Sequence, residues 1–455
     1  MDVENPATGD IIDSYEELSD EELSEAIERA DKRYQEWSNR SIQEREEFLA
    51  NAADVLREEK QRYAEVMTKE MGKPIPQAIA EVEKCAWVCD YYAKRAGRYL
   101  SDEVHSSPPG VDARTVYEPL GVVLAVMPWN FPFWQVFRFA APYLTAGNTG
   151  LLKHASNVPG CALAIQEVFE KAGYPEDVFQ SLLVSSDKVD DIIRSQQVEG
   201  VTLTGSGPAG AAVASTAGDE VKKSVLELGG SDPFIVLGDA DIDAAAETGA
   251  WARNQNGGQS CIAGKRFIVV DDVYDEFLNK FKQEFNDLTI GDPMNENTDV
   301  GPQASQSLMQ SMHGQVEESI EAGANVVVGG EPMDGEGYYY PPTILTDVPE
   351  GCPADEEEVF GPVAAVYRVN NTQEAIAKAN DTVYGLGASI WTTDMEKGRD
   401  VASQINAGCV YVNELVKSDP RVPFGGVGIS GYGRELSEAG IKEFTNRKTV
   451  WIEEG

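Results

Sequence analysis

Apolar residues recur at the three- and four-residue spacing of amphipathic helices through most of the first hundred positions. Ser19, which precedes a run of acidic residues, is typical of a helix start, because its hydroxyl can cap free backbone amides and the acids favour the positive end of the helix dipole. Gly72-Lys73-Pro74 interrupts the spacing. The pattern predicts helices over residues 19–37, 41–71 and 76–99.

Short β-branched apolar runs then alternate with helical stretches. This order predicts a parallel, doubly wound sheet with helices on both faces. The helix near residue 158 is expected to take Ser156 or Asn157 as its cap. The predicted strands are 121–127, 149–153, 178–184, 200–204 and 223–228, and the helices are 133–146, 158–172, 188–195 and 208–217.

A second βα-rich region begins near Ser231. Its predicted strands are 234–237, 266–270, 325–328, 363–367, 388–391 and 409–412, with helices at 243–256 and 273–287. The fold class is therefore α/β: a doubly wound, Rossmann-type domain, a second α/β domain and a β-strand arm. The first domain is assigned to 1–104 and 120–230, with 425–445 returning to it, and the second to 231–424.

The arm is predicted from two segments that break the alternation, 105–119 and 446–455. Residues 99–119 have the character of a projecting hairpin, and 449–452 is an exposed-looking β run at the end of the chain. A strand there without a partner in its own domain would be an unpaired edge. We therefore expect it to pair with another subunit, in a homodimer or homotetramer.

The charge balance is extreme, with 77 acidic against 37 basic residues and a formal net charge of −40. Such a surface repels nucleic acid and anionic lipid, which excludes both as partners. One interpretation is an ordinary acidic cytosolic enzyme. The favoured one is a cytosol with molar salt, where the Debye length falls to about 3 Å and self-repulsion is screened. No apolar run approaches the roughly 20 residues of a spanning helix, and a cytoplasmic location is expected.

The six cysteines are spread over the chain and form no disulfide framework, and there are only three histidines. With no HExxH and no paired CxxC, no metal site is expected. Scarce histidine also argues against a Ser-His-Asp hydrolase.

Two glycine-rich segments carry candidate chemistry. Gly205-Ser206-Gly207-Pro208-Ala209-Gly210 follows a predicted strand and opens a helix, the context in which a GxGxxG turn cradles a pyrophosphate. By that fingerprint Glu227 would bind a ribose. In the second segment Cys261 follows Gly257-Gly258-Gln259-Ser260, with Lys265 nearby. It is either a buried structural thiol or an accessible cysteine whose thiolate is favoured by the adjacent positive charge.

Several segments together resemble the aldehyde dehydrogenase superfamily, in the order and spacing of that family across nearly the whole chain. The Lys417–Arg421 segment and the short length look most like its compact succinate-semialdehyde dehydrogenase branch. The segments are Pro128-Trp129-Asn130-Phe131-Pro132, Lys153, Thr204-Gly205-Ser206, Glu227-Leu228-Gly229-Gly230, Gly258-Gln259-Ser260-Cys261, Glu358-Val359-Phe360-Gly361-Pro362, Pro423-Phe424-Gly425-Gly426 and Ser430-Gly431.

The resemblance implies NAD(P)-dependent oxidation of an aldehyde to a carboxylic acid, with the first domain as the cofactor domain and the second as the catalytic domain. Cys261 would be the nucleophile, which forms a thiohemiacetal and then a thioester. The Asn130 amide and the Cys261 backbone amide would form the oxyanion hole. Glu227 would activate the hydrolytic water, which displaces the ribose role of the bare fingerprint.

For the cofactor, the resemblance places Lys153 and Ser156 at the adenosine ribose. Ser156 stands where many NAD-using members carry a glutamate, and a serine there does not repel a 2′-phosphate. NADP is therefore favoured over NAD, although both could work if Ser156 is only a helix cap. The other implied cofactor residues are Gly205, Ser206 and Gly210 at the pyrophosphate, and Glu358, Phe360, Trp129 and Leu228 around the nicotinamide riboside.

For the substrate, Trp134 and Arg138 share a helix face. Arg138 suits a carboxylate at the far end of a small aldehyde, with Ser418 adding a hydrogen bond and Phe424 lining the tunnel; succinate semialdehyde would fit. Alternatively, Arg138 forms an internal ion pair and the enzyme accepts small aldehydes broadly.

Two rival functions remain. A coenzyme-A-acylating enzyme would not need Glu227, which is present. A non-catalytic descendant of the fold would have lost Cys261, Asn130 or Glu227, and all three remain.

Overall fold

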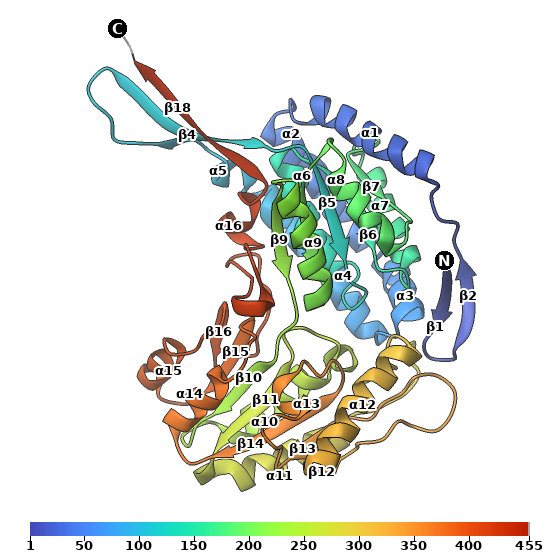
Figure 1. The fold of residues 1–455 in the computed structure, drawn as a ribbon, viewed down its shortest axis with the longest axis vertical. Helices are drawn as coiled ribbons and strands as arrows, with labels where there is room; N and C mark the ends of the chain where they lie inside the picture. The colour runs from blue at the N-terminus through green and yellow to red at the C-terminus, as the bar shows by residue number, and fades with distance from the viewer. Residues whose placement is uncertain (454–455) are drawn as a thin grey trace.

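The computed structural model describes residues 1–453, and two doubly wound sheets with a projecting arm account for most of its strands. One sheet and its helices form the upper part of the molecule in Figure 1, and the other forms the lower part. The predicted α/β class is confirmed. Both large sheets are parallel except at one edge strand each.

The first sheet has its topological switch point next to β5, because the chain runs outward on one side of this strand and then returns to its other side. Ligands of such sheets bind at the carboxyl ends of the strands beside the switch point. From edge to edge the strands are β17 (Gly431–Tyr432), β9 (Lys223–Glu227), β8 (Val198–Thr204), β5 (Val122–Met127), β6 (Thr149–His154) and β7 (Phe179–Ser181).

Alternate residues of β5 enter two separate cores, one on each face of this sheet. Val123 and Ala125 pack with one group of helices, and Val122 and Leu124 pack with the other. The first group is α2 (Ile42–Glu58), α3 (Lys60–Met71), α4 (Ile75–Ala93), α6 (Trp134–Ala146) and α7 (Pro159–Lys171). The second is α1 (Asp20–Trp37), α8 (Val189–Arg194) and α9 (Gly207–Asp219).

The second sheet is built in the same way. Phe267 and Val269 of its strand β11 face one helical layer, and Ile268 and Val270 face the other. The strand order is β12 (Asn325–Val328), β13 (Thr343–Thr346), β14 (Val363–Val369), β11 (Gly264–Val270), β10 (Asp232–Val236), β15 (Gly387–Trp391) and β16 (Cys409–Val412). The helices are α10 (Ile242–Asn254) and α11 (Asp271–Asp287) on one face, α14 (Thr372–Asn380) and α15 (Met395–Ala402) on the other, and α12 (Gln306–Ala322) and α13 (Pro353–Glu356) beside them.

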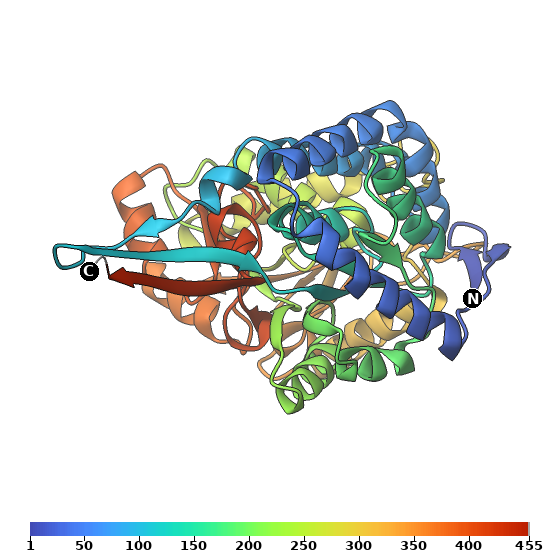
Figure 2. The same cartoon turned by 90° about the horizontal axis from the view of Figure 1, so that it is seen from above.

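The arm contradicts the premise that the C-terminal strand lacks a partner in its own chain. β18 (Thr445–Glu453) pairs antiparallel with β4 (Val111–Pro119) of the same chain, and β4 also pairs with β3 (Glu103–Val104). The C-terminal strand therefore has a partner within its own domain, and pairing of its other edge with another subunit stays a prediction. Figure 2 shows β4 and β18 extending together from the body. The last two residues of the predicted arm, 454–455, lie outside the described residues.

The N-terminal region departs from the all-helical prediction in two ways. β1 (Asp2–Asn5) and β2 (Asp10–Ser14) form a hairpin, because Asn5, Thr8 and Gly9 make a tight turn and Val3 is buried. The second and third predicted helices are each divided, at Glu59 and near Lys94, where the backbone leaves the helical region; the short α5 (Ala96–Tyr99) follows the latter break.

Within residues 1–453, no helix has the length and apolar character needed to cross a membrane. Nor do the described residues contain a cluster of three or more His, Cys, Asp or Glu side chains that could hold a metal ion.

Candidate active site

Cys261 lies on a short loop between a 3₁₀ turn, Gln255–Gly258, and β11. The loop requires glycine at two successive positions, because Gly257 and Gly258 have φ of +62° and +74°. A side chain on Gly258 would also collide with the backbone of Gly361. These glycines let the cysteine loop pack closely against the segment that follows Glu358.

Hydrogen bonds from buried side chains hold the Cys261 loop in place. Lys265 Nζ donates to the carbonyls of Ser260 and Cys261 at 3.0 and 2.7 Å. The Gln259 side chain accepts from the Ala304 amide at 2.9 Å. The loop is therefore fixed, while Cys261 itself remains partly exposed.

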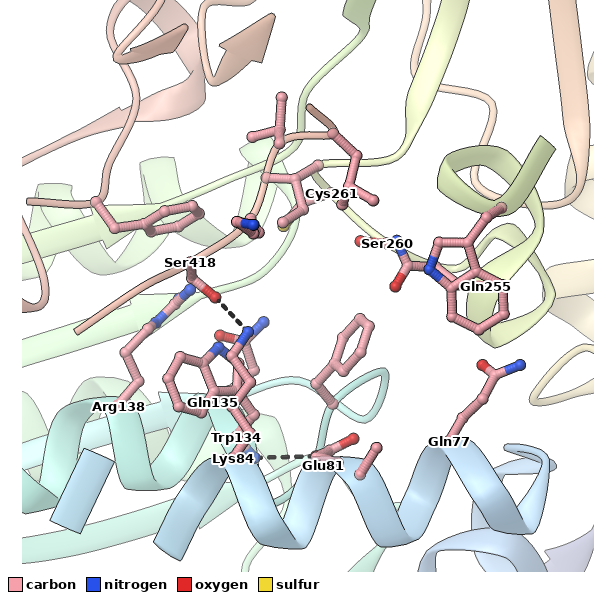
Figure 3. A pocket seen from close by; sticks show the side chains of 18 of the residues that line it. Gln77, Glu81, Lys84, Trp134, Gln135, Arg138, Gln255, Ser260, Cys261 and Ser418 are labelled. Carbon is pink, nitrogen blue, oxygen red and sulfur yellow. Dashed lines mark hydrogen bonds between the residues drawn. The ribbon is translucent and has the colours of Figure 1, made fainter. Parts of the chain in front are cut away.

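A cavity of about 310 Å³ opens beside Cys261. It brings together the predicted nucleophile and all four residues predicted to contact the substrate: Trp134, Arg138, Ser418 and Phe424. In Figure 3, Cys261 lies on one side of this space, and Lys84, Trp134 and Arg138 reach toward it from helices on the opposite side. Apolar walls with a few convergent polar groups are typical of small-molecule sites.

Burial raises the pKa of the Cys261 thiol to about 12, while the charges of Lys265 and Arg138 act to lower it. The thiol is therefore protonated at neutral pH in this structure. Since the thiolate is the nucleophilic form, a base or an additional positive charge must assist its attack.

Arg138 is buried and forms an ion pair with Glu435. Its Nη2 donates to Thr204 Oγ1 at 3.4 Å, and its guanidinium lies 4.8 Å from the centre of the Phe424 ring. The internal ion pair considered in the sequence analysis is thus present. Arg138 lines the cavity, but much of its charge is balanced before any substrate enters.

Glu227 ends β9, and its side chain lies outside the lining of this cavity. A Cβ on Gly425 would lie 2.6 Å from Glu227 Oε1, so only glycine leaves room for the carboxylate. Neither carboxylate oxygen has a hydrogen-bond partner among the described residues. Burial and the nearby Glu435 raise the Glu227 pKa well above its usual value, and Arg138 opposes this shift. Arg138 therefore influences both Glu227 and Cys261.

Asn130 also stands behind the cavity lining, in the loop between β5 and α6. Its Nδ2 donates to the Gln259 carbonyl at 3.1 Å, and its own carbonyl accepts from Asn256 Nδ2 at 2.7 Å. Asn130 is thus tied directly to the loop that carries Cys261, with one amide hydrogen still available.

The amino end of α6, which carries Trp134 and Arg138, is held by a glutamate of α4. Glu81 Oε1 accepts from the amides of Phe133 and Trp134 at 2.9 Å each, and its other oxygen forms a buried ion pair with Lys73. A helix start has free amides that need acceptors, and Glu81 supplies one in place of a local cap.

Lys84, also on α4, is a cavity residue that the sequence analysis missed. Its Nζ donates to Ser418 Oγ at 2.9 Å and lies 4.2 Å from the centre of the Trp134 ring. The available signal was periodicity: Gln77, Glu81 and Lys84 fall on one face of a mostly apolar helix. Spacing alone could not say that this face meets the Cys261 loop.

The predicted pyrophosphate residues gather at the carboxyl ends of β8 and β9. Ser206 caps α9 by accepting from the Ala209 amide, and the Gly205 amide donates to the Glu227 carbonyl at 3.0 Å. Gly210 lies against Leu228, since a Cβ there would be 2.6 Å from a Leu228 methyl group. The helix start can therefore approach an anion without a side chain in the way.

Lys153 is the next-to-last residue of β6, and Ser156 lies just after this strand ends at His154. Lys153 is buried, burial lowers its pKa, and none of the described residues forms an ion pair with it. Ser156 is exposed. Neither Ser156 nor Asn157 caps α7, contrary to our expectation: the cap position is Val158, and buried Glu70 accepts from the amides of Gly160 and Cys161. The Ser156 hydroxyl is not used for that purpose.

The predicted nicotinamide residues cluster around Glu358. Its Oε1 accepts from the Gly230 amide at 3.2 Å and pairs with Lys265 Nζ at 2.9 Å. The rings of Trp129 and Phe360 lie edge to face at 5.8 Å. Lys265 thus joins the Glu358 cluster to the Cys261 loop, a connection that the sequence analysis did not foresee.

The chain is similar to known proteins over nearly its whole length. The model of the aldehyde dehydrogenase family matches residues 1–450. The chain is 52% identical over 448 residues, 98% of each chain, to a protein of Synechocystis sp. named probable succinate-semialdehyde dehydrogenase (NADP(+)). It is 49% identical over 450 residues, 98% of each chain, to succinate-semialdehyde dehydrogenase (NADP(+)) 1 of Mycobacterium tuberculosis. The succinic semialdehyde dehydrogenase of Streptococcus pyogenes, solved in complex with NADP+, matches with a TM-score of 0.97 at 38% identity and 99% coverage of both chains.

Proposed function

Because the chain belongs to the aldehyde dehydrogenase family, we propose that it oxidises succinate semialdehyde to succinate with NADP as the hydride acceptor. The observation that carries the proposal is the cavity that joins Cys261 to Ser418 and Arg138. The names of the relatives at about half identity support the same substrate and cofactor.

In this proposal Cys261, which is partly exposed, releases its thiol proton to water. Its Sγ then attacks the aldehyde carbon, and the carbonyl oxygen becomes an oxyanion. The free amide hydrogen of Asn130 and the Cys261 backbone amide stabilise that oxyanion. The Asn130–Gln259 hydrogen bond supports this role, because it fixes the side chain before substrate arrives. Bound NADP would supply the hydride acceptor, and loss of the hydride from the former aldehyde carbon leaves a thioester on Cys261.

Glu227 then serves as the base that activates water to hydrolyse the thioester. In this step its carboxylate, which lies beside Gly425 and outside the cavity lining, would turn toward Cys261. No hydrogen bond to a described residue is lost in that rotation, since neither oxygen has a partner. The raised pKa supports the role of a base, because a carboxylate with a raised pKa accepts a proton more readily.

The residues present fit a phosphorylated adenosine ribose. Lys153 offers a positive charge without an acidic partner, and exposed Ser156 offers a hydroxyl that caps no helix. Gly205, Ser206 and Gly210 would hold the pyrophosphate side, and Glu358, Phe360, Trp129 and Leu228 the nicotinamide side.

Replacing Ser156 with glutamate is expected to reverse the cofactor preference. The new carboxylate would repel a 2′-phosphate and could bind the ribose hydroxyls of NAD instead, so the ratio of kcat/KM for NADP to that for NAD should fall by roughly 10- to 100-fold. Initial rates with each cofactor measure this ratio. Ser403→Glu, at an exposed serine beyond α15, is the matched control. An unchanged ratio in Ser156→Glu would count against the 2′-phosphate argument.

The proposed reaction is tested by reduced-nicotinamide formation in molar KCl, with succinate semialdehyde and butanal, each with NADP and NAD. A strong preference for the semialdehyde with NADP supports the proposal. Equal rates on both aldehydes would favour a general aldehyde dehydrogenase. A rate that depends on added coenzyme A would favour the acylating alternative.

We also propose that the protein works in the cytoplasm of a salt-adapted cell, and we expect its thermal midpoint and activity to fall as KCl is lowered from 2 M to 0.1 M. The acidic side chains behind the net charge of −40 repel one another. This repulsion is screened less at low salt, because the Debye length grows from a few ångström to about 10 Å. Thermal melting and rate are measured together. A matched osmolarity of an uncharged osmolyte controls for water activity, and full stability after desalting would contradict the salt argument.

The division into a cofactor domain, a catalytic domain and an arm remains part of this proposal, as does assembly into a homodimer or homotetramer through the arm. β18 and β3 are the outer strands of the arm sheet, so each presents a free edge in the isolated chain.

A further inference from the structure

We propose that Lys84 is the cation that recognises the substrate carboxylate, acting with Ser418. This inference rests on the proposed function and names the specificity-determining residue of the same cavity. It moves the main charge contact from α6, where Arg138 lies, to α4.

Lys84 lies within the cavity wall and has no acidic partner. Its Nζ donates to Ser418 Oγ and stands over the Trp134 ring, and no described carboxylate forms an ion pair with it. In Figure 3 its side chain reaches from α4 toward Ser418, into the space that Cys261 faces from the other side. A partly buried ammonium group is costly unless an anion neutralises it, so the cavity favours an anionic ligand.

The other cations of the cavity wall are already paired. Arg138 pairs with Glu435, and Lys417 Nζ pairs with Glu414 at 2.5 Å. Lys84 is the lining cation whose charge no described acid balances. A carboxylate that enters the cavity therefore gains most from Lys84.

Ser418 completes a two-point contact for a carboxylate. Because its oxygen accepts from Lys84, its hydroxyl hydrogen must point elsewhere, and no described residue takes it. A carboxylate between the two would accept one hydrogen bond from the ammonium group and one from the hydroxyl. Trp134 forms the adjacent wall and limits how far the substrate can shift.

The charges around Lys84 tune it to titrate near physiological pH. Burial and Arg138 lower its pKa to about 8, while Glu81 and Cys85 on its own helix and Asp419 on the facing loop act to raise it. Glu81 is already paired with Lys73, and Asp419 with Arg421. A bound carboxylate would therefore stabilise the protonated form.

The test is the ratio of kcat/KM for succinate semialdehyde to kcat/KM for butanal. In Lys84→Met this ratio should fall by about 30-fold, the range expected for loss of a charged hydrogen bond. The matched control is Lys94→Met, at the exposed end of the same helix, which should keep the wild-type ratio. Lys84→Arg should recover part of the preference.

The wild-type protein supplies a second test that no folding defect can obscure. The same ratio should fall as pH rises through about 8, because Lys84 loses its charge. Ionisation of Cys261 or Glu227 affects both aldehydes and cancels in the ratio. An arginine keeps its charge throughout this range, so recognition by Arg138 alone predicts a flat ratio from pH 6.5 to 9.5.

The outcomes separate the two proposals. A wild-type preference for the semialdehyde that survives in Lys84→Met, or a flat pH profile, overturns the assignment to Lys84 and leaves the proposed reaction intact. Equal kcat/KM for the two aldehydes in the wild type overturns the proposed substrate and this assignment together. A lost preference in Lys84→Met, with the predicted pH profile, supports both.

Discussion

Aldehyde oxidation should fall by on the order of 10⁴-fold or more when Cys261 is replaced with alanine. The reason is that no other cysteine lines the cavity, so the covalent intermediate cannot form. The rate of reduced-nicotinamide formation measures the loss. This variant should still bind NADP, because the Cys261 side chain makes none of the predicted cofactor contacts. The rise in thermal midpoint that NADP causes measures this binding.

Cys352→Ala is the matched control for this substitution. Cys352 is a free cysteine that precedes α13 and does not line the cavity, so its removal should leave turnover nearly unchanged. Substantial aldehyde oxidation by Cys261→Ala would reject Cys261 as the nucleophile.

Replacing Glu81 with alanine should cause the largest loss of stability among single changes near the site. It leaves Lys73 buried without its partner and removes the acceptor from the amides of Phe133 and Trp134. Loss of one member of a buried ion pair costs about 3–5 kcal/mol. Thermal and urea midpoints should both fall, and activity should fall with them, because α6 carries Trp134 and Arg138 into the cavity.

Glu83→Ala, on the same helix, tests whether burial is the cause. Glu83 pairs with Lys60 at 2.5 Å, but both side chains are about 40% exposed, and such a pair contributes at most about 1 kcal/mol. Equal midpoint shifts for the two variants would show that burial does not make the loss of Glu81 more costly than the loss of an exposed ion-pair partner.

Much of the fold could be predicted because its signals are local. A buried parallel strand is a short β-branched run, and the prediction of 363–367 falls within β14, as 409–412 matches β16. The cavity around Cys261 was also foreseen in part, since Trp134 and Arg138 are neighbours on one helix face. Their meeting with Ser418 and Phe424 depended on the family resemblance, because nearly 300 residues separate the two pairs in the chain.

The parts that sequence reasoning missed depend on contacts between distant segments. Whether Arg138 has a free charge is decided by Glu435, and the start of α6 is held by Glu81 of another helix. The C-terminal strand finds its partner in the segment 111–119 of the same chain. No periodicity or spacing reports such pairings, since each depends on how whole elements pack.

The return of the chain to the first sheet has a consequence for the order of synthesis. The edge strand β17, the counter-charge Glu435 and the arm strand β18 all come from the last 25 residues or so of the chain. During synthesis on the ribosome, the first sheet therefore keeps an unpaired edge and Arg138 has no partner until the entire second sheet has been made. The newly made enzyme is most vulnerable to misassembly in that interval, and only its final segment can complete both the sheet and the site.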